Sequence, residues 1–374
     1  MREWKDEKTG RLVRQLTDHP GGVVIHKFKK PKLLPDGWVM AHAGKPDPGI
    51  LLLHPESGGV KRVSIQASRT LRLRESDGRL WYVSPDSKTI WSVQLPDGKP
   101  ECVGKNPAPP ESAWWDVSCD GRTMVFARNE DDQSNYPLPI EGDHKQFWHY
   151  FSRPRRGSIW ACDLATGKLT KVVETEGVCP IHIEPSRADP TLVRFCHDGY
   201  EAHCQRIWTV RTDGSELRKI RPQERGEDVV HEFWWPDGKA IGYKYMDRRK
   251  DETLHERPWC ELSPMPLRLG IADLEGREFY LSDPLNCYHS HVYVSQDTKW
   301  LCGEGTIDPN FVYAARFSTR ETKVDFAPMA TIHTPCRLYV ANHVNAAFSL
   351  DSRWLLYNDT VDGKLQVCAV RVEE

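Results

Sequence analysis

The sequence lacks several features that would place it in a specialised class. No apolar run approaches the roughly 20 residues that a membrane helix needs. The opening segment MREWKDEKTGRLVRQLTD is charged from its first residues and lacks the apolar stretch of a secretory signal. Basic and acidic residues nearly balance, at 51 against 53, so no excess charge favours nucleic acid or a membrane surface. We therefore expect a cytoplasmic protein without nucleic-acid or membrane partners.

Cysteine pairs with metal-site or redox spacing are also missing. The 11 cysteines are scattered without CxxC pairs or a regular interval. In a chain without an export signal, this pattern favours reduced and mostly buried thiols.

Helical periodicity is nearly absent, and one β-type unit recurs instead. Each unit has an Asp-centred turn between alternating apolar runs, which is a strong hairpin signal. The turns are Pro35-Asp36-Gly37, Ser76-Asp77-Gly78, Cys119-Asp120-Gly121, Pro236-Asp237-Gly238, Gln296-Asp297-Thr298 and Leu350-Asp351-Ser352. A seventh unit, residues 181–199, has a longer turn around Asp189-Pro190.

Many units carry a second hairpin, such as those at 164–169, 211–217 and 360–365. Two hairpins make a four-stranded blade, and seven units spaced about 45 to 60 residues apart predict an all-β, seven-bladed β-propeller. A two-sheet sandwich explains the unit count less well. We expect residues 1–374 to form a single propeller domain in which a strand at about 10–18 completes the last blade. The 14 tryptophans suit packing between blades.

Histidines recur at one position of the predicted blades. Six residues before the turn aspartate, three successive units have His231, His291 and Asn345, and His289 and His343 lie two residues before the latter two. Equivalent residues of adjacent blades converge on the channel of a propeller, so these side chains could face a common cavity. Imidazoles with an amide oxygen suit a divalent ion such as manganese or zinc. Hydrogen bonds between blades are the alternative role.

A second group of polar residues lies in FCHDGYEAHCQRIW, residues 195–208. It offers His197, His203 and Arg206 around a loop. A planar, permanently charged guanidinium suits a carboxylate ligand. The alternative is a surface arginine stacked on Trp208. The polar and aromatic segment 128–157 is longer than a hairpin loop and could cover one face as a lid or substrate wall.

Several stretches together resemble the oligogalacturonate lyases. They are FCHDG with RIW at 195–208, TDGSELRKI at 212–220, HEFWWPDGKAIGY at 231–243, the opening TGRLVRQLT and the closing FSLDSRWLLYNDTVDGK. The resemblance spans the chain but is dense only from about 160 to 245. It implies a seven-bladed propeller that cleaves short oligogalacturonides by β-elimination, with a divalent metal held mainly by histidines.

The resemblance also implies roles for individual residues. His231 matches the catalytic base and Arg206 the arginine of the family, while His291 and His343 match two metal ligands. Asn345 stands where the family has a further histidine, and the family's glutamine ligand is replaced near Val340. We therefore expect His291, His343 and Asn345 to hold the metal, which would be manganese, with zinc or calcium as alternatives.

From these observations we predict a lyase of pectin-derived oligosaccharides. His231 would remove the proton, Arg206 would bind the carboxylate, and His197 and His203 would contact the sugar or the leaving group. Two other functions stay open. One is a related carbohydrate enzyme that acts on a different uronide or a glycoside, and the other is a non-catalytic propeller that binds a protein partner. The sequence leaves open whether the chain is a monomer or a homodimer.

Overall fold

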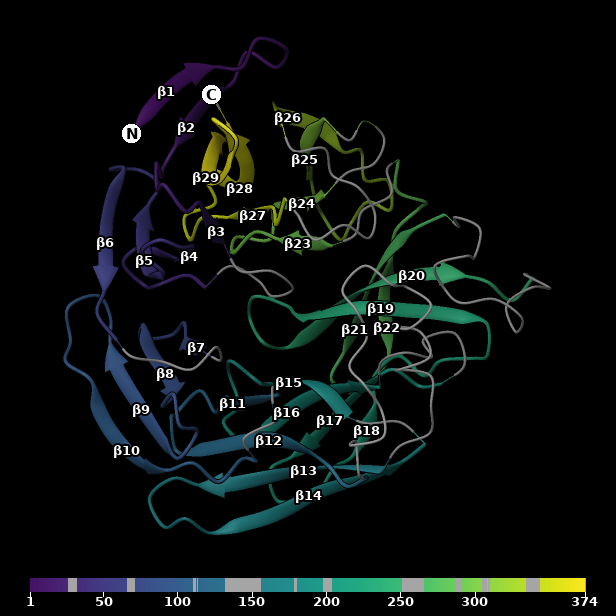
Figure 1. Cartoon of the computed structure of the whole chain (residues 1–374). Helices are drawn as coiled ribbons and strands as arrows, with labels where there is room; N and C mark the ends of the chain where they lie inside the picture. Colours follow the sequence, from purple (N-terminus) through teal and green to yellow (C-terminus); the bar gives the residue numbers. More distant parts are fainter. Residues whose placement is uncertain are drawn as a thin grey trace.

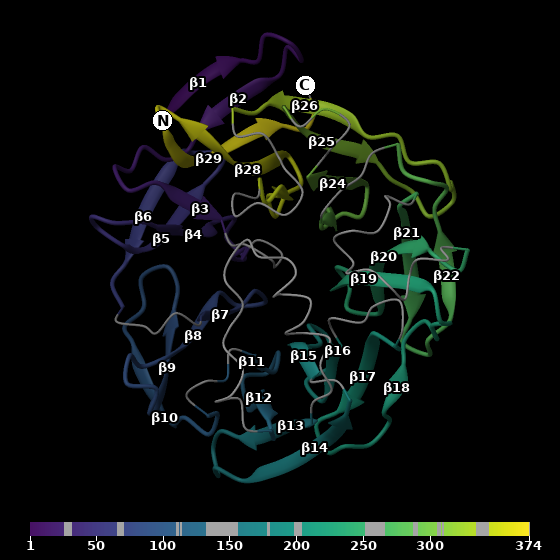
Figure 2. The same cartoon turned by 45° about the vertical axis from the view of Figure 1, so that its right-hand side comes forward.

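The computed structural model describes residues 1–25, 32–65, 71–109, 112, 114–131, 156–177, 180–197, 204–250, 266–286, 291–304, 308, 310–333 and 344–373. The strands of these residues form seven antiparallel sheets. The sheets stand as blades around a central axis (Figures 1 and 2). The prediction of an all-β, seven-bladed β-propeller is confirmed.

Three blades come from the first half of the chain. Blade 1 contains β3 (Val23–Ile25), β4 (Val39–Ala43), β5 (Gly49–His54) and β6 (Gly59–Val63). Blade 2 contains β7 (Leu71–Arg74), β8 (Arg79–Val83), β9 (Thr89–Gln94) and β10 (Glu101–Lys105). Blade 3 contains β11 (Trp115–Val117), β12 (Thr123–Asn129), β13 (Arg156–Asp163) and β14 (Leu169–Glu176).

Three further blades repeat this meander. Blade 4 contains β15 (Pro180–Pro185), β16 (Leu192–His197), β17 (Ile207–Arg211) and β18 (Arg218–Lys219). Blade 5 contains β19 (Glu227–Trp234), β20 (Ala240–Asp247), β21 (Arg268–Asp273) and β22 (Glu278–Leu281). Blade 6 contains β23 (Val292–Val294), β24 (Trp300–Glu304), β25 (Phe311–Arg316) and β26 (Ala327–Thr331). In each of blades 1 to 6 the first strand lies nearest the axis (Figure 1).

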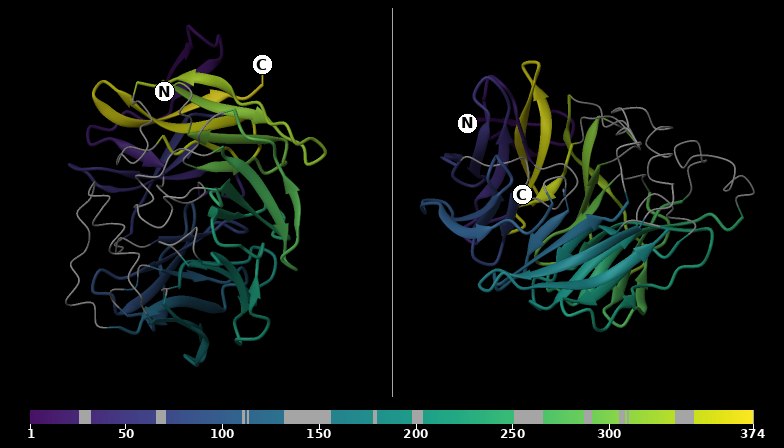
Figure 3. Two further views of the ribbon diagram at one scale, coloured as in Figure 1. Left: turned by 90° about the vertical axis from the view of Figure 1, so that its right-hand side faces the viewer. Right: turned by 60° about the horizontal axis from the view of Figure 1, so that its bottom comes forward.

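Blade 7 combines strands from the two ends of the chain. Its strand order is β1-β2-β29-β28-β27. The strands are β27 (Ala347–Phe348), β28 (Trp354–Val361), β29 (Lys364–Arg371), β2 (Leu12–Gln15) and β1 (Arg2–Lys5). Val13 of β2 pairs with Val370 of β29, and the two segments run side by side at one edge of the ring (Figure 3). This pairing closes the ring through backbone hydrogen bonds between the two ends of the chain.

The Asp-centred turns owe their shape to side-chain bonds to the backbone. In blade 3, Asp120 Oδ1 accepts the Ser118 hydroxyl at 2.6 Å and the Arg122 N–H at 3.1 Å. Gly121 follows with φ +76°, a left-handed conformation that costs glycine little. The same serine and aspartate bonds recur at Ser295 and Ser349. The turns therefore fix the same hairpin geometry in successive blades.

Apolar clusters fill the interfaces between adjacent blades. Trp115 packs between blades 2 and 3, Trp234 between blades 4 and 5, and Trp354 between blades 7 and 1. All three indoles are 1% exposed or less. Removing one buried indole costs about 3–5 kcal/mol of folding free energy. These contacts hold neighbouring inner strands at fixed distances, which positions the residues at the channel.

Two expectations from composition can be compared with the structure. The cysteines at described positions, such as Cys162 and Cys368, form no disulfide. The described part of the chain contains no helix that is long and apolar enough to cross a membrane. The cytoplasmic location and the choice between monomer and homodimer stay predictions.

Candidate active site

Five adjacent blades place a polar or aromatic side chain at one equivalent position near the axis. In each blade a backbone N–H donates across the first turn, from Ser118 to Thr123 O in blade 3, for example, and this bond marks equivalent positions. The residue four positions before the donor lies in or just before the innermost strand. It is Trp114, His182, His231, His291 and Asn345 in blades 3 to 7.

His182 is the member of this set that counting from the turn aspartate misses. The blade 4 turn runs from Ser186 to Leu192 and is one residue longer than the turn of blade 3. Six residues before Asp189 therefore lies Ile183. Counting from Ser186, whose hydroxyl accepts backbone N–H bonds within its turn, would have found His182 from the sequence.

The inner strands are distorted at this position. The pairing of β15 with β16 shifts register between Ile181 and Glu184, and the pairing of β19 with β20 shifts between Val230 and Phe233. Each shift is a β-bulge that contains one of the histidines, and bulges re-aim side chains next to functional sites.

The backbone at the equivalent position is also strained. His182, His231 and Asn345 have φ values of +51°, +54° and +50°. A residue with a Cβ pays about 1–2 kcal/mol for this left-handed conformation. Strain of this kind at the same place in three blades indicates a position kept for its side chains.

His231 and His291 come together from adjacent blades. Their rings stack with centroids 4.5 Å apart and planes 12° from parallel. Lys244 of β20 places its Nζ 3.4 Å from His231 Nδ1. The lysine is 4% exposed and His291 is 8% exposed, whereas His231 is half-buried. A buried lysine side chain therefore lies against the predicted base, and the sequence pattern gave no signal for it.

Arg206 lies inside the protein, paired with a glutamate. Its side chain is 1% exposed, and its Nε donates to Glu232 Oε2 at 2.8 Å. Glu232 directly follows His231 in the bulge of β19. The carboxylate thus links the arginine of blade 4 to the chain position of His231. Trp208, the expected stacking partner in the alternative reading, packs against Phe195 and His197.

Glu232 is the centre of a buried charge network. Its Oε1 lies 2.8 Å from Arg194 Nη1 and 3.4 Å from His182 Nδ1, and Arg194 is also paired with Glu184. Burial alone would raise the pKa of the Glu232 carboxyl, but Arg206, the His182 hydrogen bond and Arg194 hold that pKa well below its usual range. Glu232 is therefore ionised, and two carboxylates balance the two guanidinium groups.

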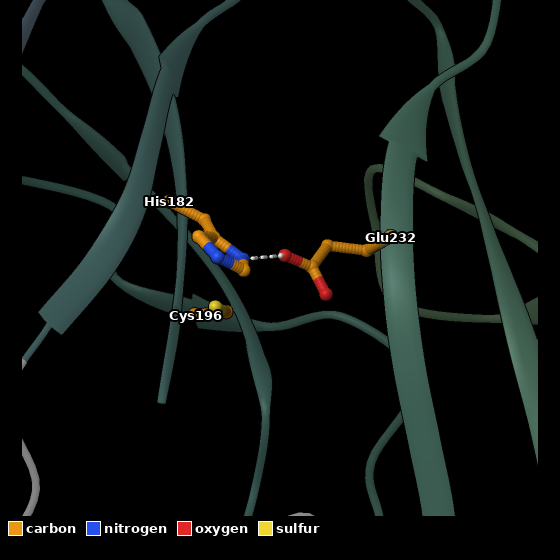
Figure 4. Close-up of side chains that lie close together, drawn as sticks. All are labelled: His182, Cys196 and Glu232. Carbon is orange, nitrogen blue, oxygen red and sulfur yellow. Dashed lines mark hydrogen bonds and ion pairs between the residues drawn. The ribbon is translucent and has the colours of Figure 1, made fainter. Parts of the chain in front are cut away.

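The same region contains a compact set of metal-ligating atoms. His182, Cys196 and Glu232 offer atoms within 4.8 Å of one another, the only such group of three or more among the described residues (Figure 4). The glutamate oxygens already face two guanidinium groups, whose positive charge opposes a cation, and a thiol is a soft ligand that manganese does not favour. This set does not fit a manganese ion.

The predicted metal ligands lie in blades 6 and 7. His291 occupies the equivalent position in blade 6, and Asn345 does so in blade 7. The Asn345 amide nitrogen donates to Ile25 O at 3.2 Å. The amide oxygen is therefore the atom of Asn345 that could bind a metal ion. An imidazole and an amide oxygen suit manganese in donor chemistry. His343 and Val340 lie outside the described residues, as does His289.

Of the two histidines predicted to contact substrate, His197 lies among the described residues and His203 does not. His197, at the end of β16, is 9% exposed, and its ring lies 5.8 Å from Phe195 and 5.6 Å from Trp208. Burial lowers the pKa of this imidazole to about 4, so it is neutral at physiological pH. His203 lies outside the described residues, and so do residues 132–155 of the expected lid.

The fold and this cluster define a seven-bladed β-propeller with histidines of adjacent blades gathered beside a buried arginine–glutamate pair. The family model described as oligogalacturonate lyase matches residues 75–268, just over half of the chain. The chain belongs to the oligogalacturonate lyase family.

Individual relatives agree with this assignment. The oligogalacturonide lyase of Pectobacterium atrosepticum is 26% identical over 253 residues, which are 62% of this chain and 60% of the relative. The oligogalacturonate lyase of Dickeya dadantii is 26% identical over 252 residues, with the same shares. The matched part of the chain thus spans about 60% of the length of these relatives.

Two solved structures share the fold over the whole chain. One is an oligogalacturonate lyase in complex with manganese, with a TM-score of 0.76 and 22% identity, covering 100% of this chain and 96% of that one. The other is an oligogalacturonate lyase from Vibrio parahaemolyticus, with a TM-score of 0.75 and 19% identity, covering 100% and 97%. At these identities the likeness establishes the propeller fold.

Proposed function

We propose that this protein is a lyase that cleaves short galacturonate oligomers by β-elimination. The observation that carries the proposal is the adjacency of His231 and Glu232 in one strained bulge. The first residue supplies an imidazole, and the second holds the buried Arg206 guanidinium. Family membership supports the same activity.

The reaction asks for a base and for stabilisation of negative charge. β-Elimination removes the proton on C5, next to the carboxylate, and expels the oxygen on C4. In the proposal, His231 accepts the C5 proton, a role that suits an imidazole near neutral pH. Arg206 stabilises the charge that develops on the substrate carboxylate, and the bond from its Nε to Glu232 fixes the plane of the guanidinium.

A divalent ion belongs to the proposal as well. His291, Asn345 and His343 would hold it, and manganese suits these donors, with zinc and calcium as alternatives. When bound, the ion would polarise the substrate carboxylate and make the C5 proton more acidic. His291 stacks on His231, so the proposed metal and base positions belong to neighbouring blades.

The experiment that tests the activity is a spectroscopic assay. Purified protein is mixed with digalacturonate in the presence of manganese, and the ultraviolet absorbance of the new C4–C5 double bond is followed. We expect a rise that chelation abolishes and added manganese restores. His231→Gln should lower the activity by at least ~100-fold. An unchanged unfolding temperature is the control for correct folding.

Other outcomes would replace the proposal. A rise with a different uronide, but none with digalacturonate, would change the substrate and keep the chemistry. No rise with any uronide, together with no manganese binding by calorimetry, would favour the non-catalytic propeller.

A further inference from the structure

His182 shares the local structure of the predicted base, His231, although the proposed reaction gives it no role. It occupies the position of blade 4 that His231 occupies in blade 5, at the same point of a β-bulge. Its φ of +51° nearly equals the +54° of His231. Two adjacent blades therefore present an imidazole to the same side through the same strained backbone.

The His182 ring is held on two sides. Its Nδ1 lies 3.4 Å from Glu232 Oε1, and its ring meets the Trp114 indole edge-on, with centroids 4.7 Å apart. Its side chain is nevertheless 31% exposed, whereas Glu232 is 1% exposed. The ring is thus anchored through the indole and through Nδ1, which is turned towards Glu232 (Figure 4), while part of the side chain is open to solvent.

Charged groups of both signs belong to the network that His182 contacts. The acidic groups around it are Glu232 from β19 and Glu184 from β15, and the basic groups are Arg206 and Arg194 from blade 4. A carboxylate that contacts Nδ1 favours a proton on that nitrogen. It also fixes the orientation of the ring, as the buried aspartate does for the histidine of serine proteases.

We propose that His182 is the general acid that protonates the leaving oxygen during the elimination. The inference rests on the proposed function. The C5–H bond breaks, the proton goes to His231, and the electron pair forms the C4–C5 double bond. The C4–O bond breaks, its electron pair stays on the glycosidic oxygen, and that oxygen takes the proton from His182 Nε2. Water then reprotonates His182 and removes the proton from His231.

The leaving group provides the test. A sugar hydroxyl is a poor leaving group that needs a proton, whereas a nitrophenolate leaves without one. The two substrates are digalacturonate and a galacturonate that carries a 4-nitrophenyl ether at O4. We expect His182→Gln to lower kcat/KM for digalacturonate by at least ~100-fold and to change the value for the aryl ether by less than about threefold. His231→Gln is the matched control and should lower both values.

A second variant guards against misfolding. His182→Gly keeps a residue that accepts positive φ, and added imidazole should restore part of its activity on digalacturonate. Equal losses on the two substrates without rescue by imidazole, or no loss on either, would overturn the role of His182 alone. A wild-type protein inactive on both substrates would instead overturn the proposed function, and the role of His182 with it.

Discussion

His231 and His291 lie face to face across the boundary between blades 5 and 6, with ring centroids 4.5 Å apart. They are 60 residues apart in the sequence, and the propeller symmetry brings them together. The contact places the predicted base and a predicted metal ligand in one cluster. It also makes the two residues separately testable, because each belongs to its own blade.

The strain at His231 predicts an unusual order of stabilities. Glycine adopts φ near +54° without a Cβ penalty, whereas alanine retains the penalty of the histidine. We expect His231→Gly to be more stable than His231→Ala by about 1 kcal/mol, with both variants inactive. Urea unfolding of the two proteins measures the difference. An alanine variant at least as stable as the glycine variant would contradict the strain.

The lysine beside His231 should matter for catalysis. Lys244 places its Nζ 3.4 Å from Nδ1 and is buried, so it orients the imidazole. We expect Lys244→Met, which keeps the apolar stem, to lower kcat/KM at least ~10-fold. Lys239→Met, on the exposed turn of the same blade, is the matched control and should leave the rate unchanged. Equal rates for the two variants would remove Lys244 from the site.

Glu232 should be among the most important residues for stability. Gln at this position removes the carboxylate charge that pairs with Arg206 and Arg194, although Arg194 keeps its pair with Glu184. Breaking a buried pair costs about 3–5 kcal/mol. The exposed pair of Arg79 and Glu101 provides the control, because Glu101→Gln should cost less than about 1 kcal/mol. Urea unfolding at neutral pH measures both.

The pH dependence of the Glu232 contribution has a defined sign. Its pKa in the folded protein lies well below the ordinary value of 4.5. The stabilisation is therefore complete above the unfolded value and is lost as pH falls through the folded value. The stability gap between wild type and Glu232→Gln should be constant above pH 4.5 and shrink below it. A gap that is unchanged in strong acid would show that the carboxylate charge is not its source.

His197 should make the protein sensitive to mild acid. Burial lowers its pKa from 6.5 to about 4, so the unfolded chain binds a proton in this interval that the folded protein does not bind. Stability is therefore complete above pH 6.5 and falls as the pH drops towards 4. We expect His197→Met to lose less stability than wild type between these two values in thermal unfolding. Parallel curves for the two proteins would contradict this.

The metal site can be located with three variants. If His291 and Asn345 bind the ion, His291→Ala should weaken manganese binding at least ~10-fold, and Asn345→His should strengthen it because imidazole is the better donor. His182→Ala should leave manganese affinity unchanged. Calorimetric titration with manganese measures all three. A loss of affinity in the His182 variant would instead place the ion at the set of His182, Cys196 and Glu232.

The hairpin turns could be predicted from sequence because their chemistry is local. Asp120 and Gly121 make the same contacts in the structure that their residue types suggest, and the equivalent turns repeat along the chain. His182 is missed by counting back from the turn aspartate, because the turn of blade 4 is one residue longer than the turn of blade 3. The constant reference is the residue whose backbone N–H closes the turn, which is a serine in blades 3, 4, 6 and 7 and Trp235 in blade 5.

The contacts of individual side chains at the site could not be predicted in the same way. No pattern links Lys244 to His231 within β19 and β20, because a bulge shifts the register between the two strands. Similarly, nothing in the spacing of Arg206 and Glu232 indicates that they meet. Glu232 takes a place where the other blades have the apolar or aromatic residues Trp115, Ile183, Val292 and Ala346. The sequence signal for the buried pair was therefore a single glutamate at a position that is apolar or aromatic in blades 3, 4, 6 and 7.

The sequence by itself determined the repeat, the class of fold and the inner-strand position at which histidines recur, since turn chemistry and strand alternation are properties of neighbouring residues. Only the tertiary structure decided which side chains face one another. It stacked His231 on His291, buried Arg206 on Glu232 and added His182 to the cluster. These contacts depend on how adjacent blades pack and on where a bulge turns the backbone, and both are set by the closed ring as a whole.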